Sequence, residues 1–122
     1  MGDIRALSRI TEEPVPLSAE QRSAVTSGSR YVRVIAGAGT GKTETIIRRT
    51  VYLLLYDGVE PGKIVAFTFT EKAAVSMRNR VYDRLKRLGN EEGCARLGSM
   101  YIGTIHGFCL RLLEEHFRYG GP

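Results

Sequence analysis

The chain has 122 residues and a net charge of +5 at pH 7, enough for one domain or part of one, and its basic balance favours polyanionic partners. Two cysteines are too few for a disulfide framework, no apolar run approaches the length of a membrane span, and the N-terminus lacks the apolar core of a secretory signal. These features lead us to expect a reduced, cytoplasmic protein.

The first stretch with a clear local signal follows a charged lead-in. Residues 1–16 are mixed in charge and end in Pro-Val-Pro, so we expect them to be a mobile lead-in. Ser18 and Gln21 then form a capping-box pattern, which predicts a short helix from Ala19 to about Thr26. The amide of Gln21 carries both a donor and an acceptor, so besides capping it can bind the adjacent edge groups of adenine.

A glycine-rich loop follows a β-rich run at residues 31–35 and opens a strongly periodic helical segment. The loop reads Ala36-Gly37-Ala38-Gly39-Thr40-Gly41-Lys42-Thr43. This order is typical of a P-loop, in which backbone N–H groups and a helix N-terminus hold phosphates. Lys42 can reach the β- and γ-phosphates of a nucleotide, and the hydroxyl of Thr43 can ligate Mg²⁺. A dinucleotide-binding pattern does not fit, because its third glycine would fall on Lys42.

The helix after this loop has an apolar or small stripe that we expect to face the core. Its members are Thr43, Ile46, Ile47, Thr50, Val51, Leu54 and Leu55. Glu44, Arg48 and Arg49 should lie off the stripe. Residues 53–57 imitate a Walker B strand that ends in an acid, but they continue the helix. Their acid, Asp57, would lie on the order of 20 Å from Lys42 at 1.5 Å per residue, so we reject that role.

Two further strand–helix units are predicted. Residues 64–67 form a short buried strand, and a helix with one basic face runs from Thr70 or Glu71 to about Leu88. Residues 100–103 form another strand, after which Thr104 caps a last helix. Strand and helix repeated three times predict an α/β fold with a parallel sheet, in which the strand ends gather at one edge and bind ligands.

The residues at the second and third strand ends allow two interpretations. Phe69 can stack on a base of single-stranded nucleic acid while neighbouring hydroxyls hold phosphates, or it can pack in the core while Thr70 caps the helix. Thr104 and His106 allow the same two roles, and spacing alone favours core and cap. The basic helix face is equally open between solvent and nucleic acid. Zinc binding by Cys94, His106, Cys109 and His116 lacks the usual paired spacing.

Four segments, in order, resemble the opening motifs of superfamily 1 DNA helicases of the UvrD/Rep/PcrA type. Residues 17–25 resemble the Q motif, residues 36–43 motif I, residues 66–77 motif Ia and residues 103–113 motif Ib. The resemblance covers nearly the whole chain. It implies a P-loop NTPase (RecA-like) parallel three-layer fold, of which residues 17–122 would be the N-terminal part of the first ATP-binding domain.

The resemblance also implies a function. A helicase of this type binds ATP, Mg²⁺ and single-stranded DNA, and translocates 3′ to 5′ by closing on a second RecA-like domain. Gln21 would read adenine, residues 36–43 would hold the nucleotide, and Lys42 and Thr43 would be the catalytic groups at its phosphates and Mg²⁺. The DNA track would include Phe69, Thr70, Thr104 and His106.

Departures from the family pattern keep alternatives open. Glu44 stands where many members have Arg, and Glu71 where many have Asn, which leaves room for the helicase part of a RecB/AddA-like helicase–nuclease. No strand ends in Asp-Glu to hold Mg²⁺, so we expect an N-terminal fragment that hydrolyses little ATP by itself and can self-associate through an uncovered sheet edge. A stand-alone nucleotide or single-stranded DNA-binding module is the other alternative. A small-molecule kinase fits less well, because no Arg-rich lid is evident.

Overall fold

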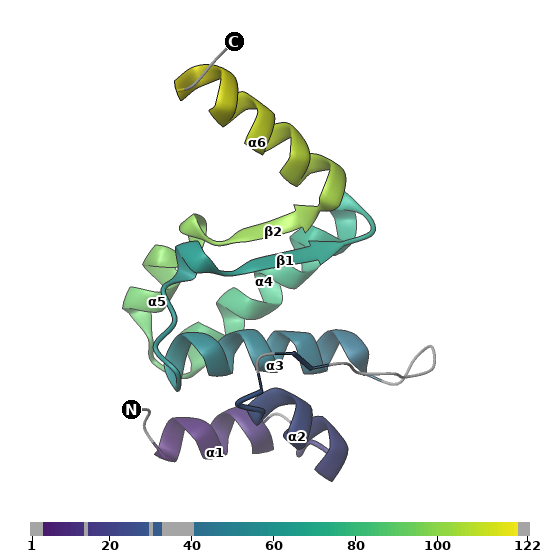
Figure 1. The fold of residues 1–122 in the computed structure, drawn as a ribbon. Coiled ribbons are helices and arrows are strands. Elements are labelled where there is room, and N and C mark those ends of the chain that lie inside the picture. The colour runs from purple at the N-terminus through teal and green to yellow at the C-terminus, as the bar shows by residue number, and fades with distance from the viewer. Residues whose placement is uncertain (1–3, 14, 30, 33–40, 120–122) are drawn as a thin grey trace.

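A computed structural model describes residues 4–13, 15–29, 31–32 and 41–119 (Figure 1). The helices and strands, in chain order, are α1 Ile4–Glu12, α2 Ala19–Thr26, α3 Lys42–Leu55, β1 Val65–Thr68, α4 Glu71–Arg87, α5 Glu91–Arg96, β2 Tyr101–Thr104 and α6 Ile105–Tyr119. Single 3-10 turns, Pro61–Lys63 and Leu97–Ser99, precede the two strands. The predicted helices at α2, α3, α4 and α6 are therefore confirmed.

The two strands form a parallel pair, joined through α4 and α5. Val65 lies opposite Tyr101 and Thr68 lies opposite Thr104, so both strands end at the same level. This confirms an α/β arrangement. The first predicted strand is not confirmed: Tyr31 and Val32 are not in a strand, and residues 33–35 lie outside the described residues. Residues 36–40 of the predicted P-loop also lie outside them.

Helix α1 was not predicted, because we expected residues 1–16 to be a mobile lead-in. Ile10 and Thr11 on this helix are buried, and α1 packs against α3. Arg9 also donates a hydrogen bond of 2.8 Å to the carbonyl of Arg87 at the end of α4. The signal was present in the sequence: Leu7, Ile10 and Thr11 have the i, i+3, i+4 spacing of a buried helix face.

Helix α3 lies between the α1–α2 pair and the layer made by α4 and the sheet (Figure 1). The fully buried side chains with the largest volumes come from three helices, α2, α3 and α4, and from the residue before β2. They are Val25, Ile47, Val51, Val81, Leu85 and Met100. A helix covered on both sides explains why so short a chain can bury a core around it.

The buried face of α3 differs from the predicted stripe. Ile47, Thr50 and Val51 are buried as expected, but Thr43 is exposed and Ile46 is nearly half exposed. Arg48, expected off the stripe, is instead one of the most buried residues, with 2% of its surface exposed. Arg48 can be buried because Glu44 on the same helix and the backbone carbonyls of Thr11 and Val15 accept its hydrogen bonds.

Strand β1 is also less covered than predicted. We expected a buried strand, but Val65 and Phe67 remain 44% and 46% exposed. The ring of Phe108 on α6 packs edge-on against two rings of the sheet. Its centroid lies 5.4 Å from that of Phe67 and 5.0 Å from that of Tyr101. These ring contacts join the start of α6 to the sheet, although much of the predicted apolar side of α6 is exposed.

Candidate functional site

The N-terminal end of α3 has the features of an anion-binding helix terminus. Gly41 is the N-cap residue, with a φ of 78° in the left-handed region, and no side chain caps this end of the helix. Lys42 and Thr43 lie in the first turn with exposed side chains. N–H groups at such an end are not satisfied within the helix, and the helix dipole adds partial positive charge. The terminus can therefore bind an anion such as a phosphate group.

Gln21 lies beside this terminus and also caps its own helix. Its Oε1 accepts a hydrogen bond of 3.0 Å from the Ser18 N–H, and its own N–H donates to the hydroxyl of Ser18 at 3.2 Å. The predicted capping box is confirmed. The Nε2 atom of Gln21 approaches Gly41 so closely that a Cβ there would lie 3.1 Å from it. The amide donor thus borders the turn that precedes Lys42, while contact with adenine stays a prediction.

Arg49 holds α2 in this position, a role that sequence reasoning missed. Its Nη1 donates to the carbonyl oxygens of Val25 and Ser27, at 2.9 Å and 2.6 Å, where α2 ends. The same guanidinium lies over the ring of Tyr52, 5.8 Å from its centroid. Helix C-terminal carbonyls commonly accept hydrogen bonds from basic side chains, and an Arg six residues beyond the glycine-rich loop is the only local signal for this contact.

The end of β1 presents one aromatic ring to solvent. The Thr70 hydroxyl accepts from the Ala73 N–H at 3.0 Å, which confirms its predicted role as the cap of α4. Thr68 donates a hydrogen bond of 2.9 Å to the Thr70 carbonyl and so tightens the turn. Phe69, between them, is fully exposed. The alternative in which Phe69 packs in the core is therefore wrong.

The end of β2 lies next to the start of α4. The Thr104 hydroxyl donates to Glu71 Oε1 at 3.0 Å and accepts from the Gly107 N–H at 3.0 Å. His106, in the first turn of α6, is exposed. The structure thus brings Thr70 and Thr104 to one edge, as predicted, and adds Glu71 between them.

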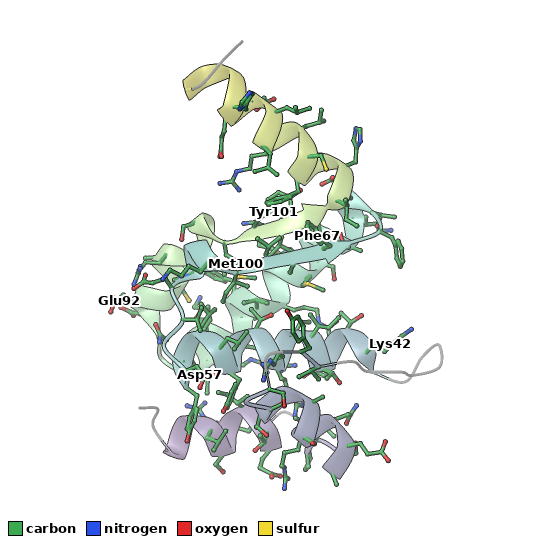
Figure 2. The ribbon with its side chains drawn as sticks, in the orientation of Figure 1. Lys42, Asp57, Phe67, Glu92, Met100 and Tyr101 are labelled. Carbon is green, nitrogen blue, oxygen red and sulfur yellow. The ribbon has the colours of Figure 1, made fainter. Side chains whose placement is uncertain are left out.

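The far end of α3 carries the rejected Walker B segment. Leu53, Leu54 and Leu55 are helical, and Asp57 lies at the opposite end of α3 from Lys42 (Figure 2). This confirms that Asp57 cannot serve an anion at Lys42. In Figure 1 the carboxyl ends of β1 and β2 lie on the same side of the molecule as the N-terminus of α3. The N-terminus of α3 and the strand-end residues therefore share one side.

The basic face of α4 divides into two parts. Arg80 and Arg84 form ion pairs with Glu44 of α3, and Arg78 donates to the Ile102 carbonyl at 3.3 Å. The remaining basic residues, Lys72, Lys86 and Arg87, are exposed. Among the described residues, no helix is long and apolar enough to cross a bilayer, and no three His, Cys, Asp or Glu side chains gather closely enough to hold a metal ion.

Fold and site together define an α/β protein with parallel strands and an exposed, uncapped Gly-Lys-Thr helix terminus. The family profile described as the UvrD/REP helicase N-terminal domain matches residues 17–121. The chain belongs to this helicase family.

Curated relatives agree with this assignment. The chain is 41% identical over 100 residues to a probable DNA helicase of Mycoplasma pneumoniae, and the match covers 82% of this chain and 18% of that protein. It is 39% identical to DNA helicase II of Escherichia coli, over 82% of this chain and 13% of that protein. It is 37% identical to the ATP-dependent DNA helicase SRS2 of Saccharomyces cerevisiae, over 85% of this chain and 8% of that protein. The chain therefore spans less than a fifth of each relative.

Proposed function

We propose that the chain binds ATP with Mg²⁺ at the N-terminus of α3 and single-stranded DNA along the strand-end edge, as part of an ATP-dependent 3′-to-5′ DNA helicase with a RecA-like P-loop fold. The observation that carries the proposal is the uncapped Gly41-Lys42-Thr43 terminus, with the Gln21 amide beside it. Family membership and the names of the relatives, which are DNA helicases, support it.

The described residues at the terminus suit a nucleoside triphosphate with Mg²⁺. Bound Mg²⁺ would neutralise phosphate charge, and the Thr43 hydroxyl would be one of its ligands. The Lys42 ammonium would balance the phosphates, and backbone N–H groups of the first turn would bind their oxygens. The Nε2 group of Gln21 would donate to an adenine ring nitrogen, while its Oε1 stays engaged in the cap.

The chain by itself is expected to bind nucleotide but hydrolyse little of it. Hydrolysis needs an acid that holds Mg²⁺ and a group that orients the attacking water. Neither β1 nor β2 ends in an acidic residue, and Asp57 lies at the wrong end of α3. K42A-sensitive turnover by the 122-residue chain would contradict this expectation.

Titration with a fluorescent ATP analogue and Mg²⁺ tests the nucleotide site. K42A should weaken binding at least tenfold, whereas K63A, which removes an exposed lysine from the 3-10 turn before β1, should leave it unchanged. Equal affinity of K42A and wild type would contradict the site.

A substitution at Gln21 separates its two roles. Q21E keeps an acceptor for the Ser18 N–H, because Glu serves a capping box as well as Gln does, but it removes the amide donor. We expect unchanged stability and a lost preference for ATP over GTP. If Q21E keeps that preference, Gln21 is a cap and nothing more.

A further inference from the structure

Glu44 is the centre of a cluster of three arginines from two helices. Its Oε1 accepts hydrogen bonds of 2.8 Å from Arg80 and from Arg84, both on α4. Its Oε2 lies 2.6 Å from Nε of Arg48 on α3 and 2.6 Å from Nη1 of Arg84. One carboxylate therefore joins the first turn of α3 to the second half of α4. We call these four residues the Glu44 cluster.

Arg48 extends the cluster to the chain segment before α2. Its Nη1 donates to the carbonyl of Thr11 at 3.1 Å, and its Nη2 to the carbonyl of Val15 at 2.6 Å. Only 3% of its side chain is exposed, whereas 21% of the Glu44 side chain is. A guanidinium so far removed from water needs its carboxylate partner.

The charges in the cluster favour an ionised Glu44. Burial raises the pKa of this carboxyl. Hydrogen bonds from Arg84 and Arg48, together with their positive charges, lower the pKa by more than burial raises it, so it lies below its ordinary value. Three guanidinium groups share this one carboxylate, so its negative charge is what offsets their mutual repulsion.

The cluster connects the two candidate binding surfaces. Glu44 is two residues beyond Lys42, in the turn that would hold the nucleotide phosphates. Helix α4 carries Arg80 and Arg84 near one end, and at its other end it follows Phe69 and is bonded to Thr104 through Glu71. A phosphate anion at α3 repels the Glu44 carboxylate and competes for the helix dipole. Nucleotide binding therefore acts on the bonds that hold α4.

We propose that Glu44 is a positioning residue that fixes α4 against the first turn of α3, so that nucleotide bound at Lys42 changes the affinity of the Phe69 edge for single-stranded DNA. This proposal rests on the proposed function for its two ligands. Glu44, where many members of the family carry Arg, then serves as a link between sites and does not contact the base.

The test measures coupling between the two ligands in the 122-residue chain. Anisotropy of a labelled oligothymidylate gives the DNA dissociation constant with and without a non-hydrolysable ATP analogue and Mg²⁺. The ratio of the two constants should be about fivefold or more in the wild type, a usual size for coupled sites. It should approach one in E44Q, although the nucleotide analogue alone should bind E44Q at least as tightly as the wild type, because the carboxylate that repels its phosphates is neutralised.

Two further variants keep the test independent of folding. R80Q/R84Q cuts the connection to α4 and leaves the buried Glu44–Arg48 pair intact, so it should also abolish coupling. E115Q removes a similarly spaced but exposed pair with Arg111 on α6 and should keep the wild-type ratio. Wild-type coupling in R80Q/R84Q, or a ratio of one in the wild type with both ligands bound, overturns the proposal.

Hydrogen exchange without ligands separates this proposal from the proposed function. If Glu44 fixes α4, the amides of α4 exchange faster in E44Q and R80Q/R84Q than in wild type, whatever the chain binds. Unchanged exchange in α4 overturns the positioning role. Failure of the wild type to bind the nucleotide analogue instead overturns the proposed function, and the exchange result still decides the role of Glu44.

Discussion

The hydroxyl of Thr104 donates a hydrogen bond of 3.0 Å to the carboxylate of Glu71, which joins the end of β2 to the first turn of α4. Glu71 thereby places a negative charge between the Thr70 and Thr104 hydroxyls that we assign to the DNA track. A carboxylate at a helix N-terminus is locally favourable, because it faces the positive end of the dipole. It opposes the approach of a phosphate from DNA.

Neutralising Glu71 is expected to strengthen binding of single-stranded DNA. E71Q keeps an acceptor for Thr104 and removes a repulsion worth about 1 kcal/mol for unit charges about 4 Å apart in water, or roughly fivefold in affinity. The gain should shrink as salt rises, because the charge is exposed. Anisotropy titrations across a salt series measure it. E92Q, which changes an exposed carboxylate at the other end of the molecule (Figure 2), is the control. No gain in E71Q would argue against a phosphate at this edge.

Phe69 gives the sharpest separation between a binding role and a structural role. Its ring is fully exposed, so F69A should leave the free energy of unfolding almost unchanged. If the ring stacks on a base, the same substitution costs about 1–3 kcal/mol of DNA-binding free energy. V75A, which truncates another exposed apolar side chain on α4, should change neither quantity. A stable F69A variant that binds DNA as tightly as the wild type would remove Phe69 from the track.

Local signals predicted much of this fold because they act over a few residues. The capping box at Ser18 and Gln21, the start of α3 at Lys42 and the cap of α4 at Thr70 were all read correctly from short patterns. The order of strands and helices gave the parallel pair and the common edge of its carboxyl ends. Thr68 and Thr104 do lie opposite each other there.

Features that depend on distant partners were not predicted. Arg48 looks like a surface residue in a helical pattern, and only the carbonyls of Thr11 and Val15 together with Glu44 make its burial possible. The link between Glu71 and Thr104 joins residues 33 positions apart, which no periodicity reveals. The burial of Val65 and Phe67 was overestimated because an apolar run shows only that a strand can be buried. It does not show whether another element packs over that strand.

Gly41 should tolerate no side chain. Its φ of 78° is unfavourable for other residues, and a Cβ would also approach Gln21 Nε2 to 3.1 Å. G41A should lower the free energy of unfolding by about 1–2 kcal/mol, in urea melts, and weaken nucleotide binding. Two controls separate the causes. Gly58 has a φ of 68° with no atom within 4 Å, so G58A reports backbone strain alone, and G28A has neither problem. Nucleotide binding as tight in G41A as in G58A would show that the contact with Gln21 does not matter.

The ion pair of Glu44 with Arg48 should make the stability of the chain depend on pH. Removing the carboxylate leaves a buried guanidinium without its partner, so E44Q should lose about 3 kcal/mol of unfolding free energy at pH 7. E115Q, whose pair with Arg111 is about half exposed on both sides, should lose about 0.5 kcal/mol or less.

The folded-state pKa of Glu44 lies below its ordinary value of 4.5. The stability that its charge contributes is therefore complete above that ordinary value and is lost as the pH falls through the folded pKa.

Urea melts of the two variants and the wild type from pH 7 to pH 3 measure this dependence. The difference in unfolding free energy between wild type and E44Q should be constant above about pH 5 and shrink as the pH falls below the ordinary carboxyl range, because the wild-type carboxyl then takes up the proton that E44Q mimics. A difference that is the same at every pH would mean that the two chains differ by packing and not by charge. In that case the Glu44 cluster would not be the electrostatic link between α3 and α4 that its geometry indicates.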